Sequence, residues 1–169
     1  MSTASDAAVQ LVADLGERKL TVAVAESVTG GLLMGALTAV PGASDVLRGG
    51  VVVYATDTKA SQLGVDPDLL ETNGPVDAEV AAAMARAVRG RWAADIGVAT
   101  TGVAGPDPQA GHEVGEVYVA VVDSVGEHVE RFSLQPGAGS ADSEQVRSRI
   151  RQDTVDAALG QIRARLGSL

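Results

Sequence analysis

The chain contains no cysteine and only two histidines, His112 and His128. Without cysteine it has no disulfide framework, no thiolate metal site and no cysteine nucleophile. Two histidines also exclude a His-rich catalytic metal site, and neither lies in a pattern that points to a role. A catalytic site in this chain would therefore use serine, threonine, lysine, tyrosine, arginine or carboxylate side chains.

Long apolar runs and positive charge are also scarce. No stretch approaches the roughly eighteen apolar residues of a membrane span, and no basic-then-apolar signal segment opens the chain. The formal net charge of -9 disfavours non-specific binding to nucleic acid or to acidic membranes. We therefore expect a soluble, cytoplasmic protein whose partners include neither nucleic acid nor a membrane.

Aromatic residues make up only 2% of the chain, whereas hydrophobic residues make up 46% and there are 20 glycines. This composition is typical of a globular protein in which helices pack closely on a sheet around alanine, valine and leucine. The 169 residues are enough to bury one core without disulfides or metal. Because no repeat or linker divides them, we expect a single domain over residues 1–169.

Hydrophobic periodicity and turn residues predict alternating helices and strands. Helices are expected from Ser5, over 31–40 and 56–63, from Asp66 to 73, from Asp77, and after the loop 136–143; strands are expected over 20–25, 51–54, 95–100, 116–123 and 128–134. The continuous apolar strands indicate a sheet covered on both faces, and the last two strands form an antiparallel pair. The order predicts an α/β fold, a three-layer α/β/α sandwich with a mixed sheet.

The first candidate for a site is the segment Glu26-Ser27-Val28-Thr29-Gly30-Gly31, between a predicted strand and a predicted helix. Ligands in open α/β sheets bind at the carboxyl ends of strands, and a helix N-terminus offers unpaired N–H groups. The two glycines would let a substrate approach the backbone. On spacing alone, the simpler explanation is that Ser27 or Thr29 is a helix N-cap.

The second candidate is Tyr54 to Lys59, which follows the second predicted strand. Lys19 and Lys59 are the only lysines among 13 lysine and arginine residues. A desolvated lysine can lose its proton and act as a base, which arginine cannot do. Taken alone, Lys59 is also explained as a solvated surface lysine.

Two further candidates lie later in the chain. The segment Thr101 to Gly105 follows the third strand and can form a nest of N–H groups around phosphate or carboxylate, or simply a sharp turn. Arg147 and Arg151 are one turn apart on the last predicted helix and could hold one phosphate together, or form a solvated basic face. The first three candidates all follow predicted strands, where an α/β site is normally assembled.

The combination and order of these motifs are more specific than any one of them. They are Ala25 to Gly31, Gly50 to Tyr54 with Lys59, Leu63-Gly64-Val65, Gly74-Pro75-Val76, and Thr101 to Pro106 with Val114-Gly115. Over nearly the whole chain they resemble the CinA C-terminal domain family, stand-alone or fused nicotinamide-nucleotide amidohydrolases (NMN deamidases). The resemblance implies hydrolysis of nicotinamide mononucleotide (NMN) to nicotinate mononucleotide and ammonia in pyridine-nucleotide salvage. It also implies an α/β/α homodimer that uses neither metal nor cofactor.

Carried over by position, the resemblance makes Ser27 the nucleophile, with Lys59 and Tyr54 in its activating network and Thr101 beside it. It also implies that an arginine of the last helix, Arg147 or Arg151, binds the substrate. An unperturbed lysine is neutral only about once in several thousand molecules at pH 7, so burial or a nearby arginine would have to lower the pKa of Lys59.

Backbone N–H groups are the remaining donors for this chemistry. Those near Thr29, Gly30 and Gly31 are expected to stabilise the oxyanion. The loop from Thr101 to Gly105, with Gly102 at its start, is expected to help the arginines bind the 5′-phosphate.

The chain departs from the family pattern at three places. Val28 stands where the family often has cysteine, Pro108-Gln109 where many members have Gly-Gly, and Gly137 to Ser143 in place of Gly-Asp-Arg. Two alternatives therefore stay open. The domain could bind a nucleotide to regulate a partner without turnover, or it could be an amidase or esterase for another small substrate.

Overall fold

The computed structural model describes residues 4–135 and 142–169. Along the chain the elements are α1 (Asp6–Arg18), β1 (Val22–Glu26), α2 (Leu32–Thr38), α3 (Ala43–Val46), β2 (Leu47–Val52), α4 (Thr56–Leu63), α5 (Pro67–Asn73), α6 (Ala78–Arg91), β3 (Ile96–Gly102), β4 (Glu116–Val122), β5 (Glu127–Ser133) and α7 (Ser143–Leu166). The order agrees with the α/β prediction. Within the described ranges, no helix is long and apolar enough to cross a bilayer.

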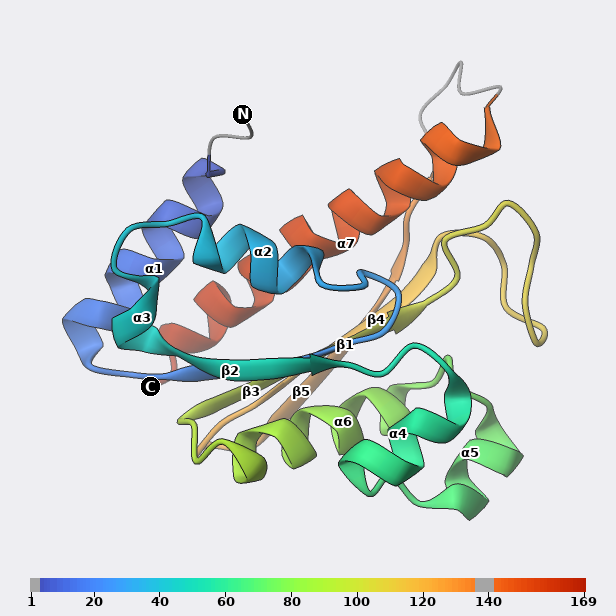
Figure 1. The fold of residues 1–169 in the computed structure, drawn as a ribbon, viewed down its shortest axis with the longest axis horizontal. Coiled ribbons are helices and arrows are strands. Elements are labelled where there is room, and N and C mark those ends of the chain that lie inside the picture. The colour runs from blue at the N-terminus through green and yellow to red at the C-terminus, as the bar shows by residue number, and fades with distance from the viewer. Residues whose placement is uncertain (1–3, 136–141) are drawn as a thin grey trace.

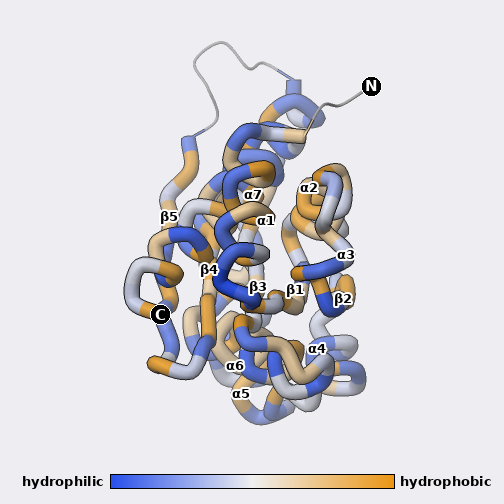
Figure 2. The backbone as a smooth tube through the Cα atoms, turned by 90° about the vertical axis from the view of Figure 1, so that its left-hand side faces the viewer, coloured by the Kyte–Doolittle hydropathy of each residue, from blue (hydrophilic) through white to orange (hydrophobic). Residues whose placement is uncertain are grey.

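The five strands form one mixed sheet in the order β2-β1-β3-β4-β5. β1 runs parallel to both β2 and β3, whereas β4 and β5 are joined in antiparallel pairs. Helices α1, α2, α3 and α7 cover one face and α4, α5 and α6 cover the other (Figure 1). Figure 2 shows the strands between these two helical layers. The predicted three-layer α/β/α sandwich with a mixed sheet is confirmed.

Side chains of β1 supply both hydrophobic cores, because neighbouring residues of a strand point to opposite faces. Val22 and Val24 pack with α1 and α7, whereas Ala23 and Ala25 pack with α6. All five residues of β1 are buried, as the continuous apolar run predicted. The small alanines on the α6 side allow that helix to lie close to the sheet.

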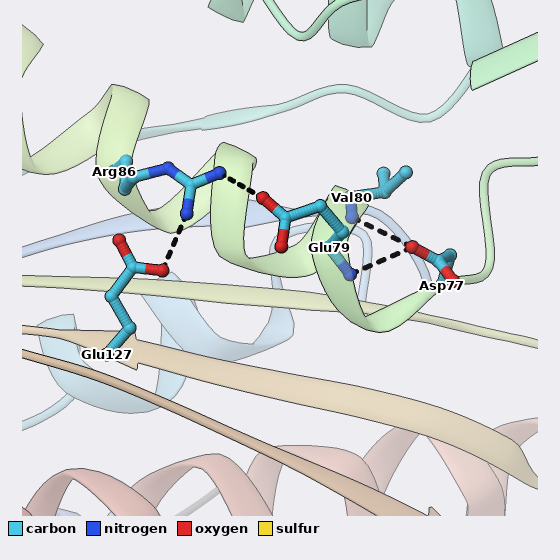
Figure 3. A network of polar contacts seen from close by, with 5 residues as sticks. All are labelled: Asp77, Glu79, Val80, Arg86 and Glu127. Atoms are coloured by element: carbon cyan, nitrogen blue, oxygen red, sulfur yellow. Dashed lines mark hydrogen bonds and ion pairs between the residues drawn. The ribbon is translucent and has the colours of Figure 1, made fainter. Parts of the chain in front are cut away.

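Several helices begin at the side chains that the sequence indicated. Ser5 accepts a hydrogen bond from the N–H of Ala8, and Asp77 accepts from the N–H groups of Glu79 and Val80 (Figure 3). Further along α6, Arg86 pairs with Glu79 and with Glu127 at the start of β5. The pair with Glu127 connects α6 to the edge strand β5, and each of these exposed pairs adds little stability by itself.

Some boundaries differ from the prediction, and β2 differs most. It begins at Leu47 and ends at Val52, whereas residues 51–54 were expected. The short helix α3 before it was not expected either. The sequence did not predict a strand over Gly49 and Gly50, because glycine is unfavourable within strands. A Cβ at Gly49 would lie 2.5 Å from the Trp92 ring, and one at Gly50 would lie 2.6 Å from the Val24 carbonyl oxygen, so close packing requires both glycines.

Candidate active site

The carboxyl ends of the three parallel strands meet at one edge of the sheet. Glu26, the last residue of β1, pairs in register with Val52 of β2 and Thr100 of β3. Ser27 therefore lies between the segment that leads to Lys59 and the end of β3, which includes Thr101. The structure brings these three predicted site residues to one cavity.

The cavity is lined mainly by the three segments that follow these strands. Its lining residues are Ser27, Val28, Tyr54, Thr56, Lys59, Pro75, Val76, Thr101, Gly102, Val103, Ala104, Gly105, Asp107, Gln109 and Arg147.

Lys59 is the largest fully buried side chain of the described residues. Its Nζ donates to Ser27 Oγ at 3.1 Å and to the Val53 carbonyl oxygen at 3.0 Å. Within the described ranges it forms no ion pair with a carboxylate. Burial disfavours the charged ammonium and lowers the pKa of Lys59 from 10.5 to about 8. About one molecule in ten then carries a neutral amine at pH 7, in contact with the Ser27 hydroxyl.

Tyr54 lies at the mouth of the cavity, with 59% of its surface exposed. Its hydroxyl oxygen accepts a hydrogen bond from Arg147, which also donates to the Gly105 carbonyl oxygen at 2.7 Å. Among the described residues, no hydrogen bond joins Tyr54 to Ser27 or Lys59. The geometry places Tyr54 beside the cation of α7 at the cavity wall, away from the buried serine–lysine pair.

The two threonine candidates occupy different positions. Thr101 lines the cavity, and its Oγ1 donates to the Pro75 carbonyl oxygen at 2.6 Å. Thr29 is fully buried, and its hydroxyl forms a 2.8 Å hydrogen bond with that of Thr100. Thr29 therefore holds the turn after Ser27 against β3, and it is absent from the cavity lining.

Glu26 lies in the first candidate segment, but the sequence analysis gave its side chain no role. Its carboxylate is fully buried and accepts hydrogen bonds from the N–H groups of Gly31, Leu33 and Met34 at the start of α2. A carboxylate at this position satisfies donors that otherwise lack partners at a helix N-terminus. An acidic residue that ends an apolar strand directly before a helix was the signal available in the sequence.

This arrangement occupies two of the three N–H groups that were expected to be oxyanion donors. The Gly31 N–H is bound by Glu26, and the Gly30 N–H donates to the Ser27 carbonyl oxygen at 3.1 Å. Neither N–H group can also bind an oxyanion. Both glycines have positive φ, 58° at Gly30 and 96° at Gly31, so their place in the turn is explained by backbone conformation.

The two arginines of α7 have separate contacts. Arg147 lines the cavity, whereas Arg151 donates to the carbonyl oxygens of Val28 at 3.2 Å and Thr29 at 2.9 Å and is not a lining residue. Only Arg147 therefore faces the space that a ligand would occupy. The expectation that both hold one phosphate does not fit this geometry.

The remaining predicted segments have defined positions at the cavity rim. Gly102 and Gly105 line the cavity, and Gly105 accepts from Arg147. Beyond them, Gln109 pairs with His112 through two backbone hydrogen bonds, so the Pro108-Gln109 departure lies in a short hairpin whose Gln109 reaches the cavity. Most of the Gly137 to Ser143 stretch lies outside the described residues.

The cavity lining combines a serine hydroxyl with a buried lysine amine that donates a hydrogen bond to it. Within residues 4–135 and 142–169, no group of three histidine, cysteine, aspartate or glutamate residues is placed to hold a metal ion. The fold and the site define an α/β domain with a buried serine–lysine pair at the carboxyl edge of a mixed sheet.

Comparisons with known proteins identify the family. A family model described as the CinA C-terminal domain matches residues 4–166. A CinA-like protein of Frankia casuarinae is 49% identical over 155 residues, covering 92% of this chain and 34% of that protein. This chain belongs to the CinA C-terminal domain family. It spans about a quarter to a third of the length of the curated relatives that it matches.

Solved structures agree with this assignment. The competence/damage inducible protein CihA from Agrobacterium tumefaciens has a TM-score of 0.85 at 35% identity, with 99% of each chain covered. A competence-damaged protein (CinA) superfamily member from Escherichia coli has a TM-score of 0.82 at 28% identity, covering 95% of this chain and 90% of that one. The resemblance inferred from the motifs is therefore confirmed.

Proposed function

We propose that this domain hydrolyses the carboxamide of NMN, giving nicotinate mononucleotide and ammonia. The observation that carries the proposal is the buried Lys59 amine, 3.1 Å from Ser27 Oγ at the wall of a cavity. Burying a lysine without a carboxylate partner lowers stability, and a site that only binds a ligand gains nothing from a buried amine in contact with a serine. A general base, in contrast, needs a pKa near the working pH.

In the first half of the reaction, neutral Lys59 takes the proton of the Ser27 hydroxyl as Oγ attacks the carboxamide carbon. A C–O bond forms, and the carbonyl π pair moves to oxygen, giving a tetrahedral oxyanion. When the carbonyl reforms, the C–N bond breaks. The Lys59 ammonium returns its proton to the leaving nitrogen, which departs as ammonia and leaves a nicotinoyl ester on Ser27.

In the second half, the same groups work on water. Neutral Lys59 accepts a proton from a water molecule, whose oxygen attacks the ester carbon. Collapse of the second tetrahedral intermediate breaks the bond to Oγ, and Ser27 recovers its proton from Lys59. Nicotinate mononucleotide is released, and both residues return to their starting states.

The 5′-phosphate of the substrate would bind at the rim of the cavity. Arg147 is the guanidinium that lines it, and its contacts with Gly105 and Tyr54 hold it there. A guanidinium presents paired donors that match phosphate oxygens. Arg147 would bind the 5′-phosphate, and the segment from Thr101 to Gly105 would surround the nucleotide. We further propose that the protein acts in pyridine-nucleotide salvage as a homodimer.

The test is release of ammonia and nicotinate mononucleotide from NMN by the purified protein, its Ser27→Ala variant and a Ser61→Ala control. Ser61 is an exposed serine on α4, so its variant should keep full activity. Turnover that disappears only in Ser27→Ala would support the deamidase and its nucleophile. Calorimetric binding of NMN without turnover would instead indicate a regulatory module, and turnover of another small amide would indicate a different amidase.

A further inference from the structure

The peptide unit between Ser27 and Val28 has its two polar ends in different environments. The Ser27 carbonyl oxygen accepts from the Gly30 N–H. Because a trans peptide is planar, the Val28 N–H points in the opposite direction. Within the described ranges no group accepts a hydrogen bond from this N–H, and Val28 lines the cavity beside Ser27. A backbone donor that the described residues leave free beside Ser27 is available to a substrate oxygen.

Arg151 fixes the next two peptide units of the same turn. It reaches across from α7, 123 residues along the chain, and binds the carbonyl oxygens of Val28 and Thr29. Two donors of one rigid guanidinium on successive carbonyls determine how these peptide planes are rotated. With the contact between Gly30 and Ser27, every carbonyl of the turn from Ser27 to Thr29 is held.

Gly30 makes room for this contact. A Cβ at position 30 would lie 3.3 Å from the Arg151 Nη2, tighter than most Cβ contacts. The turn thus combines a residue with no side chain and an arginine that uses the space.

We propose that the Val28 N–H is the oxyanion donor of the site, and that Arg151 is a positioning residue which holds this donor toward the cavity. This inference rests on the proposed function, because it gives the donor that the tetrahedral intermediate needs. The residue after the nucleophile supplies such a donor in other hydrolases. Arg151 acts through the backbone of the turn, whereas Arg147 faces the ligand.

The first experiment compares Arg151→Ala with Arg149→Ala, which removes an exposed arginine from the same helix. Steady-state kinetics are measured with NMN and with nicotinamide riboside, which lacks the phosphate. We expect Arg151→Ala to lower kcat by about 10- to 100-fold with both substrates, since small displacements of a catalytic donor have effects of this size. KM should change by less than about twofold, and the melting temperature and the kcat pH profile should match those of Arg149→Ala.

Two kinetic results would overturn the inference. An unchanged kcat would show that the turn does not need Arg151. A raised KM for NMN alone would show that Arg151 binds the phosphate. If Arg151→Ala melts at a lower temperature than Arg149→Ala, Arg151→Lys takes its place, because one ammonium can hold only one of the two carbonyls. We expect its kcat to lie between that of the wild type and that of inactive protein. A wild-type kcat in Arg151→Lys would overturn the inference.

The second experiment does not depend on NMN as the substrate. A fluorophosphonate is attacked by Ser27 Oγ, which displaces fluoride while its proton passes to Lys59, and the phosphoryl oxygen occupies the oxyanion site. Labelling should be about tenfold or more slower in Arg151→Ala than in Arg149→Ala. If the wild type is labelled but does not deamidate NMN, the proposed function fails and this ratio still tests the inference. Equal labelling rates, or no labelling of the wild type, would overturn it.

Discussion

Replacing Lys59 with methionine should make the protein more stable at neutral pH while it abolishes catalysis. Methionine has a similar length and is apolar, so it fits the buried position without a charge. In the wild type, burial lowers the pKa of Lys59 from 10.5 to about 8. At about 1.4 kcal/mol for each pKa unit, the buried ammonium reduces the folding free energy by roughly 3 kcal/mol below pH 8.

The substitution also removes two hydrogen bonds. The Val53 carbonyl oxygen loses the Lys59 donor, and the Ser27 hydroxyl loses its partner. The Ser27 hydroxyl lines the cavity and can bind water instead, so only the buried Val53 carbonyl oxygen is left unsatisfied. One unsatisfied buried group costs about 1–2 kcal/mol, which leaves a net stabilisation of about 1–2 kcal/mol at pH 7. For a domain of this size, we expect the melting temperature to rise by roughly 4 °C.

The stabilisation by Lys59→Met should depend on pH in a defined direction. Because the pKa of Lys59 is lower in the folded state, the unfolded state binds more protons between about pH 8 and 10.5. Wild-type stability therefore recovers as the pH rises through this range, and the advantage of the variant declines with it. Below about pH 8 the advantage is complete.

Thermal and urea unfolding of wild type and Lys59→Met between pH 6 and pH 10 measures this difference. Lys19→Met is the matched control, since Lys19 is the only other lysine and is exposed. Its variant should show no such dependence on pH. Two results would refute the argument that the buried Lys59 ammonium reduces stability. One is a Lys59→Met variant less stable than the wild type at pH 7, and the other is a difference in stability between the two proteins that is the same at every pH.

Three further predictions follow from the same geometry. The kcat/KM for NMN should rise about tenfold from pH 7 to a plateau near pH 9 as Lys59 loses its proton, and Lys59→Arg should be inactive throughout, because arginine stays protonated. Gly30→Ala should lower kcat by at least about tenfold and stability by about 1–2 kcal/mol, as measured by kinetics and urea unfolding, because its φ is 58° and it faces Arg151; Gly35→Ala, with no atom within 4 Å of a Cβ, should keep wild-type kcat. Asp123→Ala should cost about 3 kcal/mol in urea unfolding, since the buried carboxylate binds Arg165 through two hydrogen bonds, whereas Asp14→Ala at an exposed pair should cost less than about 1 kcal/mol.

Much of the local structure could be predicted from the sequence. Ser5, Asp66 and Asp77 cap the helices that they were expected to begin, because a cap forms between a side chain and N–H groups two or three residues away. The ends of β1 and β3 were likewise placed to within about two residues, although β3 continues through Thr101 to Gly102, where a loop was expected. Lys59 was singled out because the chain uses so few lysines.

The sequence did not reveal how those segments would use their polar groups. Gly49 in β2 packs closely against Trp92, and the sequence pattern alone did not predict a strand there because glycine is unfavourable within strands. The sequence left the N–H groups of Gly30 and Gly31 as possible oxyanion donors. In the structure the Gly30 N–H donates to the Ser27 carbonyl oxygen and the Gly31 N–H donates to the Glu26 carboxylate. Such assignments depend on the direction in which a helix leaves the strand.

Residue types and their order along the chain therefore determined the layers, the helix starts and the presence of a serine and a rare lysine after neighbouring strands. Only the tertiary structure decided that Lys59 is fully buried, that Arg147 meets Tyr54, and that Arg151 meets the turn at Val28. The latter two contacts join residues 93 and 123 positions apart. They depend on how the helical layers pack against the sheet, and desolvation of Lys59 has the same origin, so no local pattern encodes them.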